Sequence, residues 1–101
     1  MSLNGKQRSE LRRLGNTMDS VFQLGKDGIS EETYRHLDNL LRTRELIKIT
    51  VLKSCPLDTK EAANGLAAYC SAAVVQVIGR KILLYRFSPE LAKEGKGIKI
   101  L

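Results

Sequence analysis

At residues 21–30 the chain reads Val21-Phe22-Gln23-Leu24-Gly25-Lys26-Asp27-Gly28-Ile29-Ser30, and there an apparent strand passes into an apparent helix. Glycine lacks a Cβ and adopts positive φ readily, so the backbone from Gly25 to Gly28 can approach a ligand closely. The helix that follows points its free N–H groups and the positive end of its dipole at this loop. Lys26 adds a full positive charge. The loop is therefore a candidate phosphate site, and an ordinary turn is the alternative, because glycine pairs also form turns.

Regular patterns flank this loop on both sides. Residues 21–24 predict a short strand, and Ser30 is a good N-cap for a helix that ends near residues 42–43. The apolar spacing of this helix predicts a buried face made of Tyr34, Leu37, Leu40 and Leu41. His36, the only histidine, falls on the opposite side, where we expect it to be exposed.

The second half of the chain continues the alternation of strands and helices. Residues 46–52 predict a strand with one apolar and one mixed face. Asp58 and Glu61 fit a capping box at the start of a third helix. The residues expected to be buried by that helix are Ala62, Leu66, Tyr69, Cys70 and Ala73. Residues 74–78 and 82–86 predict two strands, joined at Gly79-Arg80 by a type II′ turn.

The N-terminal end of the chain predicts a definite helix, whereas the C-terminal end carries little information about its structure. Residues 5–18 predict a short helix that ends near Gly15-Asn16 and carries one apolar stripe. The rest of its surface is strongly basic and contains Lys6, Arg8, Arg12 and Arg13. Residues 89–101 are expected to form a tail that is irregular or adds a short edge strand at 98–100.

The order of these elements predicts an α/β fold. We expect a compact α-β-α-β-α-β-β domain over residues 1–88, followed by the tail over residues 89–101. Each strand–helix–strand unit favours a parallel crossover, and the final hairpin adds an antiparallel pair. The sequence therefore predicts a four-stranded mixed sheet.

Composition limits the kinds of function that this chain can have. Its 101 residues fit one domain, and 17 Lys and Arg against 11 Asp and Glu give a net charge of +6. Such a balance favours a polyanionic partner. No signal peptide or membrane span is recognisable, and Cys55 and Cys70 suit free thiols in a reducing cytoplasm, where we expect the protein to act. No acid–base pair, triad, zinc spacing or nucleotide fingerprint occurs, so we expect neither an enzyme, nor a cofactor, nor a small-molecule substrate.

Three basic features are candidates for binding RNA: the first helix, the glycine loop, and the turn that carries Arg80 and Lys81. If they share one side, the expected mode is recognition of RNA backbone and shape, because the five aromatic residues offer little base stacking. The candidate residues are Lys6, Arg8, Arg12, Arg13, Gly25, Lys26, Asp27, Gly28, Arg80 and Lys81. The alternative is an adaptor that binds an acidic ribosomal or translation-factor protein through the same face. For either function we expect a monomer. A membrane-surface role is a distant third.

Four segments in this order resemble the CRM domain, the chloroplast RNA splicing and ribosome maturation family, and above all its stand-alone bacterial, YhbY-type members. They are Leu3-Asn4-Gly5-Lys6-Gln7-Arg8, residues 23–30, residues 45–49 and residues 75–86. The resemblance implies a fold similar to the C-terminal domain of bacterial translation initiation factor three. It also implies a KH-like GxxG loop that contacts RNA, here at Gly25, Lys26, Asp27 and Gly28, and by analogy a role with large-subunit precursors in ribosome assembly.

The loop departs from the family pattern at one position. Family loops commonly read Gly-Lys-Asn-Gly, whereas this chain has Asp27. The carboxylate either weakens phosphate binding at the loop or turns away to cap the helix.

Overall fold

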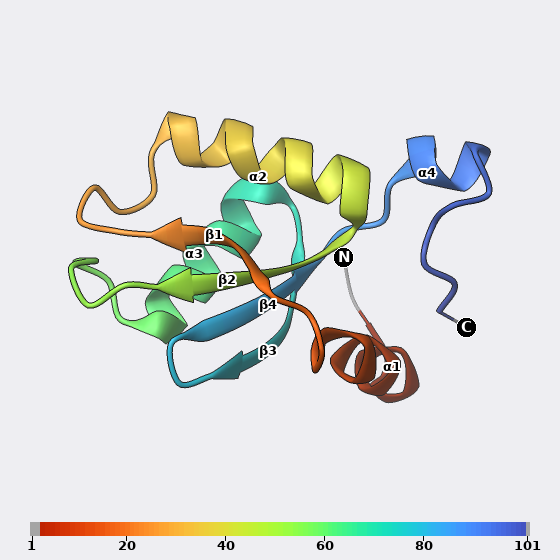
Figure 1. Ribbon diagram of the computed structural model, residues 1–101, viewed down its shortest axis with the longest axis horizontal. Helices are drawn as coiled ribbons and strands as arrows, with labels where there is room; N and C mark the ends of the chain where they lie inside the picture. The colour runs from red at the N-terminus through yellow and green to blue at the C-terminus, as the bar shows by residue number, and fades with distance from the viewer. Residues whose placement is uncertain (1–2, 101) are drawn as a thin grey trace.

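The computed structural model describes residues 3–100, which form four helices and four strands (Figure 1). In chain order they are α1 (Gly5–Gly15), β1 (Ser20–Leu24), α2 (Glu31–Arg44), β2 (Leu46–Val51), α3 (Thr59–Cys70), β3 (Ala73–Ile78), β4 (Lys81–Tyr85) and α4 (Pro89–Lys93). The first seven elements confirm the predicted α-β-α-β-α-β-β order, and α4 is an addition.

The strands form one four-stranded mixed sheet, as predicted, and the structure gives the strand order as β1-β2-β4-β3. β1 and β2 pair in parallel because α2 carries the chain back to the same end of the sheet. β3 and β4 form the expected antiparallel hairpin, in which Gly79 has φ +55°, as the first central position of a type II′ turn requires. β4 also pairs antiparallel with β2, so the last strand of the chain lies inside the sheet.

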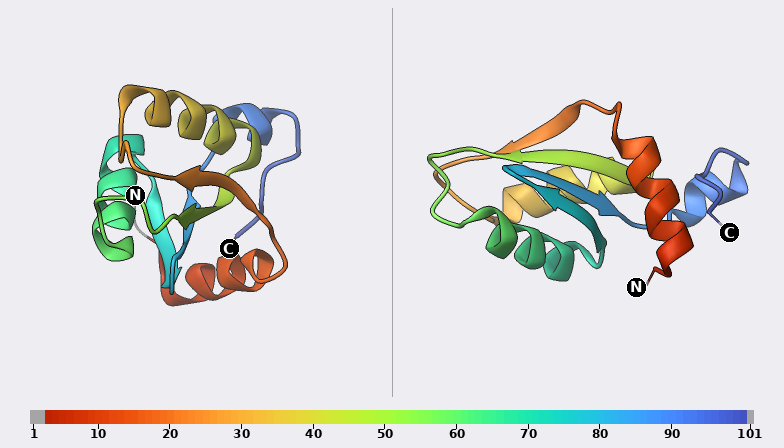
Figure 2. Two further views of the ribbon diagram at one scale, coloured as in Figure 1. Left: turned by 60° about the vertical axis from the view of Figure 1, so that its left-hand side comes forward. Right: turned by 90° about the horizontal axis from the view of Figure 1, so that it is seen from below.

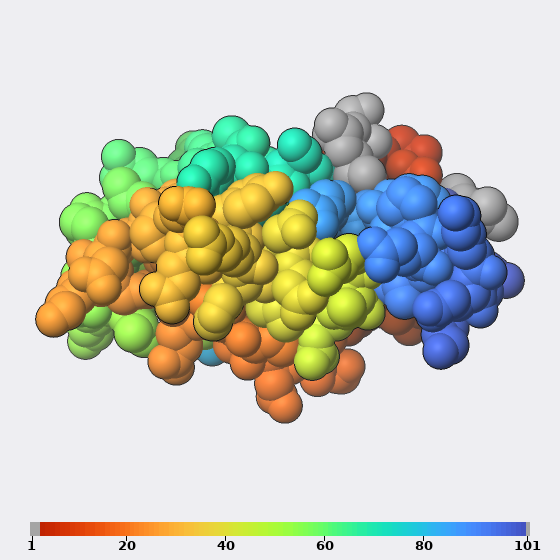
Figure 3. All heavy atoms as spheres, turned by 90° about the horizontal axis from the view of Figure 1, so that it is seen from above, coloured from red at the N-terminus to blue at the C-terminus, as the bar shows by residue number. Residues whose placement is uncertain are grey.

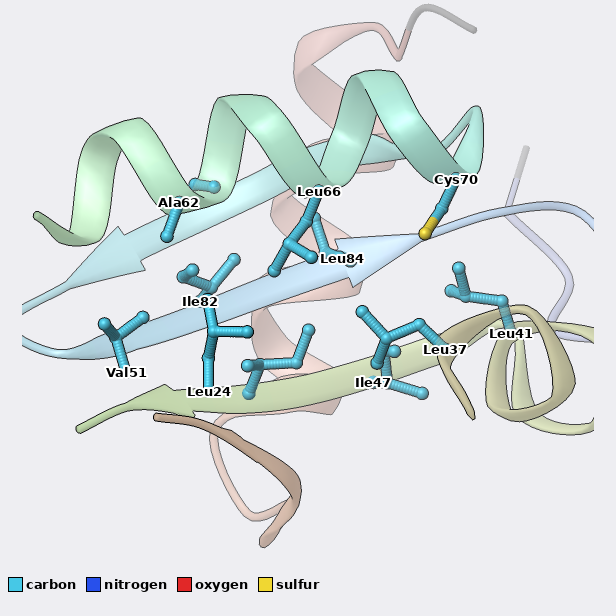
Figure 4. Packing of buried hydrophobic residues seen from close by; sticks show 12 residues of the cluster. Leu24, Leu37, Leu41, Ile47, Val51, Ala62, Leu66, Cys70, Ile82 and Leu84 are labelled. Atoms are coloured by element: carbon cyan, nitrogen blue, oxygen red, sulfur yellow. The ribbon is translucent and has the colours of Figure 1, made fainter. Parts of the chain in front are cut away.

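Helices lie on both faces of this sheet (Figure 2). The strand residues Ile47, Ile49 and Val51 alternate along β2 and pack against α2 and α3 in the main core (Figure 4). Figure 4 shows Leu37 and Leu41 from α2, and Leu66 and Cys70 from α3, directed at the strands. A smaller cluster fills the opposite face under α1; it consists of Leu11, Leu46, Val75, Leu83 and Tyr85.

Side-chain caps fix where the three long helices begin. Ser30 caps α2 and Asp58 caps α3, and both positions confirm the sequence predictions. Asp58 accepts a hydrogen bond from the Glu61 N–H at 2.7 Å, and the Glu61 carboxylate accepts one from the Asp58 N–H, as a capping box requires. Asn4 and Gln7 form the same arrangement at α1. Each N-cap contributes about 1 kcal/mol, so these residues set the helix boundaries locally.

The predicted burial of Tyr69 and the placement of Ala73 in the third helix were wrong. The buried face of α3 is formed by Ala62, Ala63, Leu66 and Cys70, and Tyr69 lies one position outside this face with 46% of its surface exposed. Its ring packs on Tyr34, with the ring centroids 5.1 Å apart. Ala73 belongs to β3, because Ser71 adopts a left-handed conformation (φ +53°) that ends the helix.

The tail forms a short helix, which the prediction lacked, and residues 94–100 are irregular, without the edge strand that was the other predicted form. Ser88 caps α4 and Pro89 occupies its first position, both of which favour a helix start. Behind α4, the tail folds back so that Ile98 and Ile100 pack against the smaller cluster. Figure 3 shows the tail, in blue, against the C-terminal end of α2.

A buried carboxylate holds this tail in place. Glu45 has no exposed surface, and its carboxylate accepts hydrogen bonds from the Ser88 N–H at 2.5 Å and the Ile98 N–H at 2.6 Å. Its backbone adopts φ +65°, an uncommon conformation for a residue with a side chain. Glu45 therefore joins the end of α2 to two points of the tail, a role that no local sequence pattern indicates.

Candidate nucleic-acid interface

The glycine loop is a tight turn between β1 and α2. The Gly28 N–H donates to the Gly25 carbonyl at 3.0 Å, and Gly28 is buried with φ +63°. A residue with a Cβ would be strained at this position, which explains the second glycine of the pair. Lys26 and Asp27 are exposed at the tip between them.

The charges around the loop are mixed. The side-chain oxygen of Ser30 already accepts from the Thr33 N–H, and the exposed carboxylates of Glu31 and Glu32 lie in the first turn of α2. These groups offset the positive end of the helix dipole, so the attraction for an anion rests chiefly on Lys26. Because Ser30 is the N-cap, Asp27 does not cap α2, and its carboxylate remains exposed beside Lys26.

A hollow of about 180 Å³ lies between the loop, β1 and the first turns of α2. Its lining includes Phe22, Glu32 and His36 in addition to the loop residues 25–28. His36 is exposed, as predicted, and meets the Phe22 ring edge-on with the centroids 5.8 Å apart. The sequence predicted that His36 is exposed, but no pattern in it indicated that His36 lines the same hollow as the glycine loop.

The structure brings two of the three basic features to the same end of the sheet. The Arg80 carbonyl accepts from the Val51 N–H at 2.8 Å, and the Leu24 carbonyl accepts from the Leu52 N–H at 2.9 Å. These bonds tie together the end of β1, the end of β2 and the β3–β4 turn. The glycine loop and the turn with Arg80 and Lys81 therefore lie at one end, and α1 lies toward the other (Figure 1).

The four basic side chains of α1 differ in how free they are. Arg8 is half-buried, and its guanidinium donates to the Val74 carbonyl at 2.5 Å and the Val75 carbonyl at 3.2 Å. Arg13 forms an ion pair with Glu10, and this hydrogen bond lowers the pKa of the Glu10 carboxyl. Within residues 3–100, Lys6 and Arg12 form no ion pair with a carboxylate. The helix therefore offers Lys6 and Arg12 to an anion more readily than Arg8 or Arg13.

We expect Arg8→Ala to lower the free energy of unfolding by about 1–3 kcal/mol, because two carbonyls would lose a charged donor. Arg12→Ala, in the same helix, is the matched control and should change it by no more than about 0.5 kcal/mol. Urea unfolding of both variants measures the difference. Equal stability of the two would contradict the structural role of Arg8.

The remaining chemistry of the described residues is sparse. No group of three or more His, Cys, Asp or Glu in residues 3–100 is placed to hold a metal ion. Burial raises the pKa of the Cys70 thiol, which packs in the main core, and burial followed by the nearby Glu45 raises the pKa of Tyr85. None of the helices described here has the length and apolar character needed to cross a membrane.

Comparison with known proteins gives consistent matches along the chain. The family model for the CRS1/YhbY (CRM) domain matches residues 3–86. A curated protein of Bacillus subtilis, named "Probable RNA-binding protein YqeI", is 36% identical over 98 residues, which cover 97% of this chain and 98% of that protein. An "RNA-binding protein" of Haemophilus influenzae is 34% identical over 90 residues, with 88% of this chain and 90% of that protein covered.

A solved structure shares the fold. The solution structure of a hypothetical protein from Staphylococcus aureus superposes with a TM-score of 0.79 at 40% sequence identity, and the match covers 99% of this chain and 100% of that one. The likeness therefore extends through the tail, beyond the residues that the family model matches.

Proposed function

This chain belongs to the CRM domain family, and from that premise we propose that it is a non-catalytic RNA-binding protein that contacts ribosomal RNA during assembly of the large subunit. The names of the relatives support RNA as the partner. The net charge of +6 is consistent with a polyanion. We also propose that the protein acts as a monomer in the cytoplasm.

The observation that carries the proposal is that the exposed lysine of the glycine loop lies at the same end of the sheet as the basic β3–β4 turn. Lys26 projects from a turn whose backbone is closely folded, and Arg80 and Lys81 lie at the same end of the sheet. Phosphates of one RNA backbone can therefore meet the loop and the turn together. Such contacts give affinity without reading sequence, and their strength falls as salt rises.

In this arrangement α1 supplies a second group of contacts. Lys6 and Arg12 lie away from the loop, so they would meet a different part of the same RNA. An RNA long enough to reach both ends of the sheet is then bound more tightly than one that meets only the loop. Structured ribosomal RNA, which presents many phosphates in fixed positions, suits this requirement.

The proposal is tested by measuring binding to precursor and mature large-subunit ribosomal RNA over a salt series. Wild type is compared with Lys26→Glu and with Lys93→Glu, a matched charge reversal at an exposed position of α4. We expect wild-type affinity to fall steeply with salt and the Lys26→Glu dependence to be shallower by about one unit of log–log slope. Lys93→Glu should bind like wild type.

Two other results would change the proposal. Tight binding that Lys26→Glu leaves intact would keep the RNA function and remove the glycine loop from the site. Absence of binding to either RNA at moderate salt would overturn the RNA function. An association with an acidic ribosomal protein that survives nuclease treatment would then identify the protein as an adaptor.

A further inference from the structure

Part of one face of the sheet is left uncovered by α1. This helix crosses the sheet at one end and covers Leu46, Leu83 and Tyr85, which belong to the smaller cluster. Farther along β2, the same face carries Lys48 and Thr50, because alternate strand residues point to the same side. The right-hand view of Figure 2 shows α1 across one end of the strands and the remainder of this face without a helix. We refer to the uncovered part as the open sheet face.

Strand pairing arranges the open sheet face in two rows, the first of which borders α1 and includes Leu83, buried at the edge of that helix. Lys48 pairs with Leu83, which pairs with Gln76, and in the next row Thr50 pairs with Lys81, which pairs with Ile78. A hollow of about 150 Å³ lies over these rows. Its lining consists of Asn16, Lys48, Gln76, Ile78, Lys81, Ile82 and Leu83.

The two charged residues that line this hollow, Lys48 and Lys81, are both positive. Lys48 and Lys81 are diagonal neighbours on adjacent strands, and all seven lining residues lack a carboxylate. Among residues 3–100, the Lys81 ammonium donates to hydroxyls alone, at 2.9 Å to Thr50 Oγ1 and 3.4 Å to Ser20 Oγ. Asp19, which precedes β1, forms no ion pair with either lysine. Both ammonium groups would attract an anion that binds over these rows, because no carboxylate of the lining competes with it.

The polar and apolar neighbours of the lysines narrow the kind of anion. Asn16 and Gln76 carry amides, which donate and accept hydrogen bonds and so match the edge of a nucleobase. Ile78 has 61% of its surface exposed at the rim and offers an apolar contact to a base or sugar. A free phosphate would use the lysines but would leave the amides and the isoleucine without a partner.

We infer that the open sheet face holds unpaired nucleotides of the RNA, with phosphate at Lys48 and Lys81 and a base edge at Asn16 and Gln76. This inference rests on the proposed function and adds a second contact surface to it. A base in a duplex has its pairing edge occupied, whereas an unpaired base can present that edge to amides. The open sheet face lies between α1 and the end with the glycine loop, so it joins the separated basic features into one track (Figures 1 and 2).

The test compares two RNA probes: a hairpin with six unpaired nucleotides beside its stem, and the same hairpin without them. Lys48→Gln and Ile78→Asn are the variants, and Lys93→Gln, with the same loss of charge on α4, is the control. We expect Lys48→Gln to weaken binding of the extended hairpin about 5-fold and to lower its log–log salt slope by about 0.7. Binding of the blunt hairpin should not change, and Lys93→Gln should match wild type on both probes.

Contact between the RNA and Lys48 can be measured directly by modifying lysines with an amine-reactive reagent and analysing the protein by mass spectrometry. The extended hairpin should protect Lys48 in the wild-type protein and leave Lys93 reactive. Unchanged binding by Lys48→Gln and Ile78→Asn, with weakened binding by Lys26→Glu, would overturn this inference and leave the proposed function standing. No binding of either hairpin by wild type would overturn both.

Discussion

Glu45→Ala is expected to lower the free energy of unfolding by about 3–5 kcal/mol and to release the tail from the rest of the protein. The buried carboxylate accepts from the N–H groups of Ser88 and Ile98, and the substitution removes both acceptors. A buried N–H that loses its acceptor costs about 1–3 kcal/mol, and here two are affected. Alanine would also keep the positive-φ backbone of residue 45 (φ +65°) without any compensating contact.

Glu45→Gln separates the shape of the side chain from its charge. Its amide oxygen can still accept one of the two hydrogen bonds, so we expect a smaller loss of about 1–3 kcal/mol. Urea unfolding measures stability, and limited trypsin digestion at Lys93, Lys96 and Lys99 reports release of the tail. Glu94→Ala, at an exposed position of the tail, is the matched control and should leave both readings unchanged. Wild-type stability of Glu45→Ala would show that the carboxylate does not hold the tail.

Reversing Arg12, Lys26 and Arg80 together to glutamate is expected to weaken binding of large-subunit ribosomal RNA by about 100-fold or more. Each lost phosphate contact costs about 1 kcal/mol or more, and each new carboxylate repels the backbone. We also expect the log–log salt slope to fall by about two to three. The measurement is a binding titration between 50 and 300 mM salt, about the range in which such contacts weaken most visibly.

The loss of RNA affinity in the triple variant can be separated into a contribution from the loop end of the sheet and one from α1. Lys26 and Arg80 lie at one end of the sheet and Arg12 lies in α1, so the double variant at the loop end and Arg12→Glu should have additive effects. Three reversals take the net charge from +6 to zero. The matched control therefore reverses three exposed residues near α4, namely Arg42, Lys93 and Lys96. An equal loss in this control would mean that net charge alone, and no particular site, governs binding.

Much of the fold could be predicted because its signals are local. Ser30 and Asp58 mark helix starts through hydrogen bonds to residues three positions away, and Gly79 marks a turn through its own backbone. Alternation along β2 gave its buried face correctly. The error in the tail involves a contact between distant residues, because Glu45 reaches Ile98 and no periodicity in either segment records this pairing. The errors at Tyr69 and Ala73 were local and concern the face and the end of α3.

The candidate site could be predicted in content but not in arrangement. The basic residues and the glycine pair are visible in the sequence, whereas the engagement of Arg8 with carbonyls more than 60 residues away depends on the folded structure. The separation of α1 from the glycine loop follows from β1, because α1 precedes the first residue of this strand and the loop follows its last. In the sequence, Lys48 and Gln76 stand out only as polar residues on strands that are otherwise rich in apolar ones. The register of the strands was needed to place them in one row, on either side of Leu83.

The position of β4 inside the sheet has a consequence for the newly made chain. Because β4 pairs with β2 on one side and β3 on the other, β2 keeps an open edge until residue 85 has left the ribosome. Before then only β1 and β2 can pair, and two strands alone are marginal. Folding is therefore expected to occur as one step that waits until β4 is available, and a nascent chain stalled before residue 81 would expose an unpaired, apolar strand to aggregation and proteolysis.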